Sequence, residues 1–201
     1  MNRAIFQGVT AVIVTDPVPA EVQIGTGTNN QYYTPVNGYY DYSQYGAILQ
    51  TSQLSAVAGK PLTGIEFRFQ SWSTPYVMPN QTIKLGHIAE SVWGNTDYPE
   101  VDYSDYTVTD MTTVKSNFTL TIVNDWVRID FDTPFTYDGT SNILISWENR
   151  DGDWGSGYGG SWHTSSSGLQ FARWHQDNSY PTGSTSTRSY YFPTVKLHYL
   201  D

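Results

Sequence analysis

The sequence predicts an all-β fold: an antiparallel sandwich of two β-sheets, with jelly-roll-like connections between the strands. Aromatic residues make up 15% of the 201 residues, with 16 Tyr and 7 Trp, and this composition favours strands over helices. Several short segments alternate apolar and polar residues, as strands with one buried face do. Gly, Pro, Asn and Asp separate these segments. The strand patterns do not alternate with helix patterns, as they would in a protein with a parallel sheet.

The N-terminal segment differs in pattern from the rest of the chain. We expect residues 1–22 to form an extended arm and residues 23–201 to form the β-sandwich domain. The prolines of "PVPAEV" (17–22) exclude a helix there, because proline lacks the amide proton and clashes with the preceding turn. An arm of this kind is suited to docking on a neighbouring subunit. The alternative is that the segment supplies the first strand of the domain.

Strand patterns recur from residue 24 onward. The clearest is "LTGIEFRFQSW" (62–72), in which Ile65, Phe67 and Phe69 share one face and polar residues occupy the other. The predicted strands, in chain order, are 46–54, 62–72, 81–90, two within 118–135, 141–148, 169–176 and 192–200. The long connections at 94–117, 149–168 and 177–190 are the segments in which we expect function or interfaces.

Charge and composition exclude several classes of protein. The net charge is −9, from 10 basic and 19 acidic residues. A negatively charged surface repels nucleic acid, so nucleic acid is not an expected partner. The chain has no cysteine, which excludes disulfides and thiolate metal sites. No stretch approaches the roughly 20 apolar residues of a membrane helix, so membrane insertion is not expected. No signal peptide is recognisable, which fits a mature form, a cytoplasmically made protein or a phage protein released by lysis.

The segment "NRDGDWGSGYGGSWHT" (149–164) carries oxygen donors around a glycine turn. Ca²⁺ takes six to eight oxygen ligands and tolerates loops of varied geometry. The 12-residue EF-hand pattern is absent, so a solvated polar turn is the alternative to a Ca²⁺ site. The donors that would form the site are Glu148, Asn149, Asp151 and Asp153, with Asp138 from a neighbouring loop.

No catalytic pattern is complete, and we expect a protein that is not an enzyme. The four histidines form no closely spaced ligand pair, and no G-x-S-x-G nucleophile motif is present. A glycosidase needs two carboxyl groups about 5–9 Å apart. Among 19 acidic residues some pair meets that distance by chance, and nothing in the sequence marks one as buried.

Aromatic residues in the glycine-rich loops are the strongest positive signal. Exposed Trp and Tyr rings stack on the C–H faces of sugars, and they also anchor protein interfaces. The alternative is that most of these rings pack in the core. The predicted ligand or interface residues are Trp154, Tyr158, Trp162, Trp174 and Tyr180. The tyrosine-rich run at 31–45 is interpreted as structural, because alternating tyrosines can cover the face of a sheet.

A series of phrases occurs in an order that resembles a known family. They are "IGTGTNNQYYTPVNGYYDYSQYGAILQTSQL" (24–54), "GIEFRF" (64–69), "TIKLGHIAESVW" (82–93), "DWVRIDFDTPFTYDGTSNILISWENRDGDW" (125–154) and "YYFPTVKLHY" (190–199). Together they resemble a β-sandwich module that recurs in cell-surface and secreted multidomain proteins of Bacteroidetes. That module is similar to jelly-roll adhesin and carbohydrate-binding domains.

The chain departs from that family's usual setting, because it stands alone, lacks a signal peptide and carries an added arm. These departures fit a phage virion protein. We therefore expect a structural or assembly protein, such as a capsid decoration, head-fibre or tail-associated protein, that docks on other subunits through residues 1–22. The alternative is an extracellular carbohydrate-binding or adhesion module whose aromatic loops contact surface glycans. The expected location is the virion or the cell surface.

Overall fold

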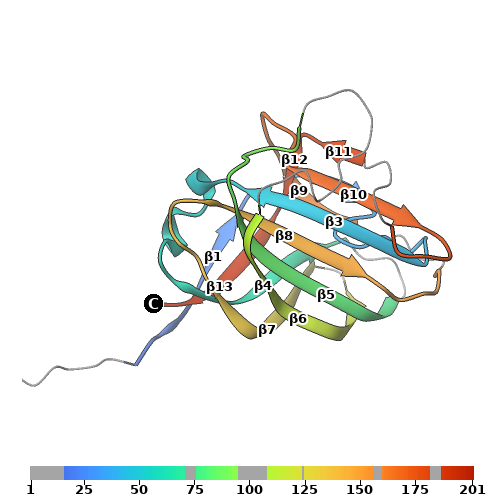
Figure 1. The fold of residues 1–201 in the computed structure, drawn as a ribbon, viewed down its shortest axis with the longest axis horizontal. Helices are drawn as coiled ribbons and strands as arrows, with labels where there is room; N and C mark the ends of the chain where they lie inside the picture. Colours follow the sequence, from blue (N-terminus) through green and yellow to red (C-terminus); the bar gives the residue numbers. More distant parts are fainter. Residues whose placement is uncertain (1–15, 71–75, 95–107, 124, 156–159, 182–186) are drawn as a thin grey trace, which may run out of the picture.

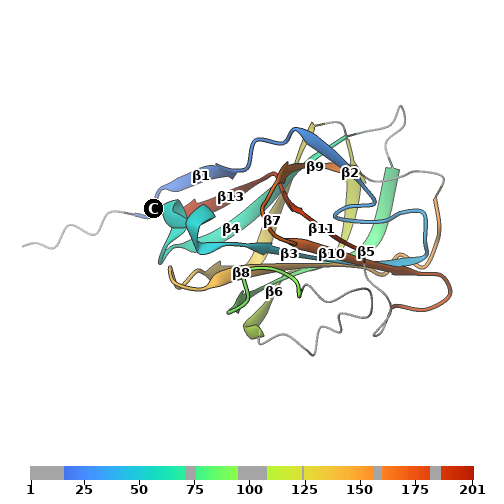
Figure 2. The same ribbon diagram turned by 90° about the horizontal axis from the view of Figure 1, so that it is seen from above.

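The computed structural model describes residues 16–70, 76–94, 108–123, 125–155, 160–181 and 187–201. In these residues the strands form two antiparallel sheets that pack face to face (Figures 1 and 2), so the predicted all-β sandwich is confirmed. Single 3₁₀ turns at Thr51–Gln53 and Ser55–Val57 follow one of the strands. Nowhere in the described ranges does a helix reach the length and hydropathy needed to cross a membrane.

The two sheets collect strands from all parts of the chain. Sheet A contains β1 (Pro19–Ile24), β13 (Val195–Leu200), β4 (Pro61–Phe69), β7 (Asp125–Thr136), β9 (Gly160–Ser165), β12 (Tyr191–Pro193) and β2 (Asn29–Tyr32). Sheet B contains β11 (Thr187–Ser189), β10 (Phe171–Gln176), β3 (Tyr42–Leu49), β8 (Asn142–Asn149), β5 (Tyr76–Ile88) and β6 (Val108–Ile122). The sequence patterns predicted most of these strands but missed β2, β9 and β11, which are short or lie within the long connections, and they placed most of β1 in the expected arm.

The pairing of the longer strands follows a jelly roll. In sheet A the order is β1, β13, β4 and β7, and in sheet B it is β3, β8, β5 and β6. Successive long strands therefore alternate between the two sheets, except for the hairpin of β5 and β6 within sheet B, and this is the order of a jelly roll. Strands β9 to β12 are inserted between β8 and β13. Strands β10 and β11 extend sheet B beside β3. Strands β9 and β12 extend sheet A from Phe69, the last residue of β4.

The core lies between the sheets, where the alternating residues of each strand meet. Ile65, Phe67 and Phe69 of β4 are fully buried on one face, as predicted from their spacing. Phe67 packs edge-on against Trp147 of β8, with ring centroids 5.3 Å apart. Because Trp147 comes from the opposite sheet, this contact joins the two layers at the centre of the core.

The outer face of sheet B carries a second apolar cluster. Ile48 of β3 and Leu144 of β8 are fully buried there, although they point away from the main core. Trp93, from the segment after β5, covers this face and packs edge-on against Trp174 of β10, with ring centroids 5.7 Å apart. The predicted contact residue Trp174 is therefore a packing residue, with only 3% of its surface exposed.

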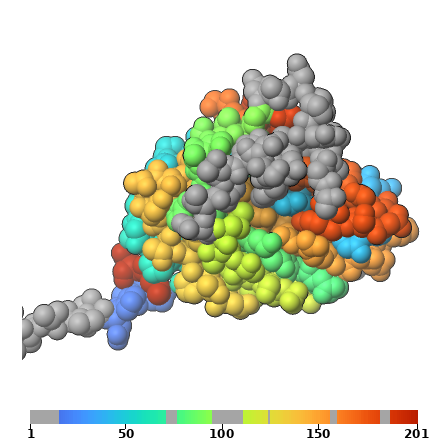
Figure 3. Space-filling model, in the orientation of Figure 1, coloured from blue at the N-terminus to red at the C-terminus, as the bar shows by residue number. Residues whose placement is uncertain are grey.

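The first described residues lie beside the C-terminus (Figure 3). Strand β1 pairs along its whole length with β13 at the edge of sheet A, and Val18 and Asp201 extend this ladder by exchanging backbone hydrogen bonds of 3.1 and 2.9 Å. Residues 19–22 of the predicted arm therefore belong to the sandwich, and the predicted boundary at residue 23 lies too late. Residues 1–15 lie outside the described residues.

Candidate functional site

Three connections meet at one end of sheet B. Strand β3 lies between β8 and β10, and its first residues pair with the last residues of both neighbours: Ser43 with Asn149, and Tyr42 with Gln176. Because the strands are antiparallel, the loop that enters β3 lies beside the loops that leave β8 and β10. Segments that are more than 100 residues apart in the chain therefore form one surface.

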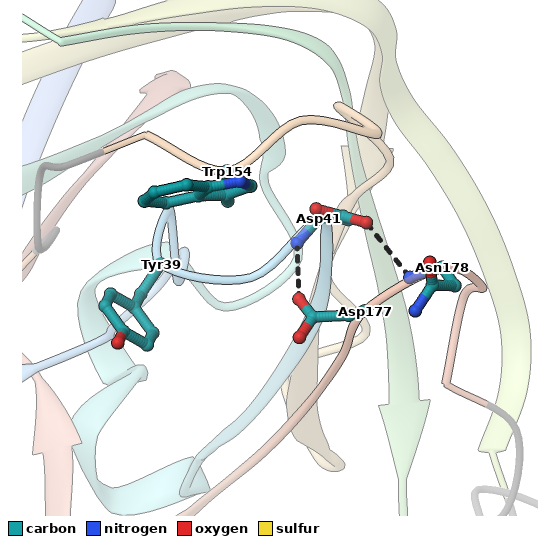
Figure 4. A pocket seen from close by; sticks show the side chains of 5 residues that line it. All are labelled: Tyr39, Asp41, Trp154, Asp177 and Asn178. Carbon is teal, nitrogen blue, oxygen red and sulfur yellow. Dashed lines mark hydrogen bonds between the residues drawn. The ribbon is translucent and has the colours of Figure 1, made fainter.

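A pocket of about 440 Å³ opens where these loops meet (Figure 4). Tyr39 and Asp41 come from the loop before β3, Trp154 from the loop after β8, and Asp177 and Asn178 from the loop after β10. The two aromatic rings lie at one side of the pocket, and the two carboxylates and the amide lie at the other. Trp154 is 61% exposed and Tyr39 is 44% exposed, so both rings are accessible from solvent.

Asp41 holds the three loops together. Its carbonyl oxygen accepts a 2.9 Å hydrogen bond from the amide of Gly152, and its Oδ2 accepts one of 3.0 Å from the amide of Asn178. The Asp41 amide faces Oδ1 of Asp177 at 3.5 Å. Gly152 has a φ of +78°, a conformation that L-residues rarely adopt, so a glycine suits this turn. These contacts of backbone amides with a carbonyl oxygen and two carboxylates hold the three loops together within the protein itself.

Aromatic contacts also support the loops around the pocket. The ring of Tyr40 lies on the imidazole of His175, with centroids 4.0 Å apart. The Arg150 guanidinium lies 3.6 Å from the centroid of the half-buried Tyr180 ring, which is a close cation–π contact. Tyr180, a predicted contact residue, therefore supports the loop after β8.

The pocket combines flat apolar surfaces with free hydrogen-bonding atoms. Within the described ranges, Oδ1 of Asp41, Oδ2 of Asp177 and the side-chain amide of Asn178 make no hydrogen bond to the protein. These atoms offer both acceptors and donors to a ligand. The carboxylates give this rim a negative charge, so the pocket suits a neutral or cationic polar ligand with an apolar face.

A third acidic group lies beside the pocket. Burial raises the pKa of Asp151 to about 6, and the negative charges of Asp153 and Asp41 raise it further in the same direction. A carboxyl group whose pKa is higher in the folded than in the unfolded chain stabilises the fold in its protonated form. This contribution is complete below the unfolded pKa of about 4, and it is lost as the pH rises through about 6.

We expect Asp151→Asn to stabilise the protein at pH 7.5 and not at pH 4. The shift corresponds to about 3 kcal/mol without screening, and the partial exposure of the group reduces the expected gain to about 1 kcal/mol. Urea unfolding of both chains at the two pH values measures it. Asp16→Asn, at an exposed position, removes the same charge and controls for net charge. An equal gain from Asp151→Asn at pH 4 and 7.5 would show that ionisation is not the cause.

The structure separates the aromatic residues that were predicted as one contact surface. Trp154 lines the pocket, and Tyr158 lies outside the described residues. Trp162 is half-buried in β9 of the other sheet, with the Arg68 guanidinium 5.6 Å from its ring. Of the predicted aromatic residues, therefore, Trp154 alone among those described lines this pocket. Sequence analysis missed Tyr39, Asp41, Asp177 and Asn178, because only the pairing of β3 with β10 and β8 brings their loops together.

The five residues predicted to bind Ca²⁺ do not converge. Both carboxylate oxygens of Glu148 are engaged, by Lys84 at 2.5 Å and by Arg150 at 2.9 Å. Asn149 is fully buried, and its Oδ1 accepts hydrogen bonds from Gln81 and from the amide of Asp151.

Asp138 lies before β8, whereas Asp151 and Asp153 lie after it, so the length of β8 separates them. The carboxylate of Asp138 accepts hydrogen bonds from Thr140 and Ser141 in its own turn. Burial acts to raise its pKa, but these hydrogen bonds lower the pKa to about 2. The predicted set is therefore wrong as a single metal site.

Comparisons with known proteins find no match: no family model fits the chain, no curated protein is similar to it, and no solved structure resembles it. The resemblance to Bacteroidetes surface modules therefore stays an expectation, and the arguments below rest on the geometry of the chain itself.

Proposed function

We propose that the protein is a carbohydrate-binding module and that the pocket of Trp154, Tyr39, Asp41, Asp177 and Asn178 is its binding site. The observation that carries the proposal is the placement of two exposed aromatic rings beside three polar side chains with free hydrogen-bonding atoms. A sugar ring has the complementary surface, because its C–H face is apolar and its hydroxyl groups both donate and accept hydrogen bonds.

The charge of the pocket selects among sugars. The carboxylates of Asp41 and Asp177 line it, and Asp151 and Asp153 lie close to it. A sialic acid or uronic acid would bring a further negative charge into this field, and like charges that meet in a complex disfavour binding. The site therefore favours neutral sugars, and an amino sugar is compatible with it.

The backbone hydrogen bonds between the loop after β8 and the loop before β3 support binding without large rearrangement. Gly152 and Gly155 each donate a 2.9 Å hydrogen bond to the loop before β3, so Trp154 is held between two anchored residues. A ring that is already positioned loses less conformational freedom when a ligand stacks on it. The pocket is open to solvent, so it can accept one unit of a longer sugar chain.

A glycan array probed with the full chain, followed by calorimetry on the strongest neutral glycan, tests the proposal. We expect Trp154→Ala to lower the affinity at least tenfold, about 1.4 kcal/mol, because the stacking surface is lost. Trp154→Phe should retain part of the affinity. Tyr190→Ala removes an aromatic ring that is 55% exposed outside this pocket and should leave the affinity unchanged.

Two outcomes would contradict the proposal. One is an array without any neutral glycan above background. The other is an equal affinity loss in Trp154→Ala and Tyr190→Ala, which would mean that the ring at 154 has no special role. A preference for acidic glycans would contradict the charge argument. In that case the affinities of Trp154→Ala and Tyr190→Ala for the acidic glycan would show whether this pocket is the site.

Assembly into a virion through the N-terminal arm was the first function expected from the sequence, with sugar binding as its alternative. Its supports in the sequence were the missing signal peptide, the single domain, the absence of cysteine and the arm, of which residues 1–15 lie outside the described residues. Within the described part of that arm, which begins at Asp16, the residues from Pro19 onward pair with β13 in the sandwich. Virion assembly through residues 1–15 therefore stays an expectation, and the geometry of the pocket is the support for sugar binding.

A further inference from the structure

We propose that Glu21 and His198 bind a divalent transition-metal ion of the Zn²⁺ class on the outer face of sheet A, with Glu66 as the hydrogen-bonded partner that orients the imidazole. This inference is independent of the sugar pocket, which lies at the end of sheet B. Glu21, Glu66 and His198 form a group in which one ligand atom from each residue lies within 4.8 Å of the other two.

Three neighbouring strands of sheet A bring these residues together. Glu21 of β1 lies directly opposite His198 of β13 in the strand register. Glu66 lies on β4, the next strand, and its Oε1 is 2.7 Å from Nε2 of His198. Glu66 is 8% exposed and His198 is 6% exposed, so the strands around them fix both side chains.

The hydrogen bond to Glu66 determines which nitrogen of His198 is available. An ionised carboxylate only accepts hydrogen bonds, so Nε2 must carry the proton. In the neutral imidazole, Nδ1 then presents a lone pair. Nδ1 lies 3.9 Å from Oε2 of Glu21, which is too far for a hydrogen bond, and it has no hydrogen-bond partner within the described part of the chain.

The gap between these two atoms is slightly wider than a metal ion requires. Zn²⁺ binds imidazole nitrogen at about 2.0–2.1 Å and carboxylate oxygen at about 2.0–2.2 Å. In a tetrahedral site two such ligand atoms lie about 3.4 Å apart, whereas Nδ1 and Oε2 lie 3.9 Å apart. A small rotation of Glu21, whose side chain is 50% exposed, gives a bent arrangement without moving the backbone.

The surroundings supply the remaining features of a metal site. A hollow of about 210 Å³, lined in part by Glu21 and His198, has room for water ligands. Glu66 on the other nitrogen of His198 matches the carboxylate–histidine–metal arrangement, which raises the basicity of the ligand nitrogen. The nitrogen ligand favours ions such as Zn²⁺ over Ca²⁺.

Lys196 competes with a metal ion for the same carboxylates. Its Nζ lies 3.2 Å from Oε1 of Glu21 and 3.8 Å from Oε2 of Glu66. It also lies 5.1 Å from the centre of the Trp126 ring, so it has a second favourable contact. Removing this ammonium should therefore strengthen metal binding, a change opposite in direction to loss of a ligand.

Calorimetric titration of the full chain with ZnCl₂ at pH 7.5 tests the proposal. We expect one saturable site that EDTA removes. His198→Gln should abolish it, Glu21→Gln should weaken it at least tenfold, and Glu66→Gln should weaken it by about 10–100-fold through loss of the orienting partner. Lys196→Met should strengthen it by several-fold.

His87→Gln is the matched control. His87 also lies beside a carboxylate, with Nε2 3.9 Å from Oδ1 of Asp138, but this nitrogen already accepts a hydrogen bond from the Asp138 amide. The variant should bind Zn²⁺ like the parent chain. Hydrogen exchange gives a second measurement, because an ion between β1 and β13 should slow exchange of the β1 amides.

The proposal is overturned if the parent chain shows no saturable Zn²⁺ site. It is also overturned if Glu21→Gln binds Zn²⁺ as tightly as the parent chain. Because Glu21 is half-exposed, this variant is expected to fold even if His198→Gln does not. Weakening by Lys196→Met would likewise contradict the assignment of Glu21 as a ligand.

Discussion

Replacing Trp147 with Ala is expected to lower the free energy of unfolding by about 3–5 kcal/mol, which is the usual cost of deleting a fully buried tryptophan. Trp147 has no exposed surface. Its ring packs against Phe67 of the opposite sheet and against Phe118 of β6, with centroids 5.3 and 5.8 Å away. The cavity would therefore open at the contact between the two layers, where neighbouring strands are least able to collapse.

The tryptophan also completes a buried polar chain. Its Nε1 donates a 2.9 Å hydrogen bond to Oε1 of Gln81, and Nε2 of Gln81 donates one of 2.5 Å to Oδ1 of Asn149. Gln81 and Asn149 are fully buried. Trp147→Phe keeps an aromatic ring but leaves the Gln81 oxygen without a donor, which costs about 1–3 kcal/mol.

Urea unfolding at pH 7.5 measures both losses. Trp154→Ala makes the same substitution at the exposed position and should change the stability by less than about 0.5 kcal/mol. The burial argument would be wrong if Trp147→Ala and Trp154→Ala cost the same, and the hydrogen-bond argument would be wrong if Trp147→Phe were as stable as the parent chain.

Mild acid is expected to destabilise the protein through His163. Burial lowers the pKa of this imidazole to about 3, and the nearby charge of Arg173 acts in the same direction. Its Nδ1 lies 3.0 Å from the carbonyl oxygen of Ser161, so Nδ1 donates and Nε2 accepts the 3.1 Å hydrogen bond from Tyr45. His163 thus stabilises the fold in its neutral form, which makes both hydrogen bonds.

The folded pKa lies below the unfolded value of about 6.5, so this contribution is complete above pH 6.5 and is lost as the pH falls toward 3. Each pH unit in that window costs about 1.4 kcal/mol, which gives about 2 kcal/mol at pH 5. Burial also lowers the pKa of His175, and this adds a loss in the same direction.

Urea unfolding at pH 7 and pH 5 checks the prediction. His163→Gln cannot gain a proton, so the loss between these pH values should shrink by about 2 kcal/mol, whatever its stability at pH 7. Tyr45→Phe removes the hydrogen bond but leaves the imidazole buried, and it should retain the pH dependence. If the parent chain and His163→Gln lost equal stability, the titrating group would lie elsewhere.

The alternation of apolar and polar residues predicted the strands well where a strand has one buried face. In β4, Ile65, Phe67 and Phe69 point inward as their spacing requires. Alternation failed in β2 and β11, which are short, and in β9, which was assigned to a loop. These strands form because neighbours already in place offer them backbone partners, for example β9 for β2. No local pattern carries that information.

Similar reasoning from sequence led to opposite results for Trp154 and Trp174. Trp154 follows strand β8 and Trp174 lies in strand β10, both of sheet B, and both were predicted as contact residues. Trp154 is 61% exposed at the end of the sheet, whereas Trp174 is covered by Trp93, which comes from a segment about 80 residues earlier in the chain. The exposure of Trp174 therefore depends on a distant segment of the chain, which the residues around Trp174 do not reveal.

By itself, the sequence determined the all-β class, the two-layer arrangement and the inward residues of the long strands, because period-two alternation reflects burial of one face and needs no long-range information. Only the tertiary structure decided which loops meet. The pocket of Tyr39, Asp41, Trp154 and Asp177 depends on β3 pairing with both β8 and β10, and the group of Glu21 and His198 depends on the first strand pairing with the last. Sites built across strands arise from register between distant segments, and register is a property of the assembled sheets.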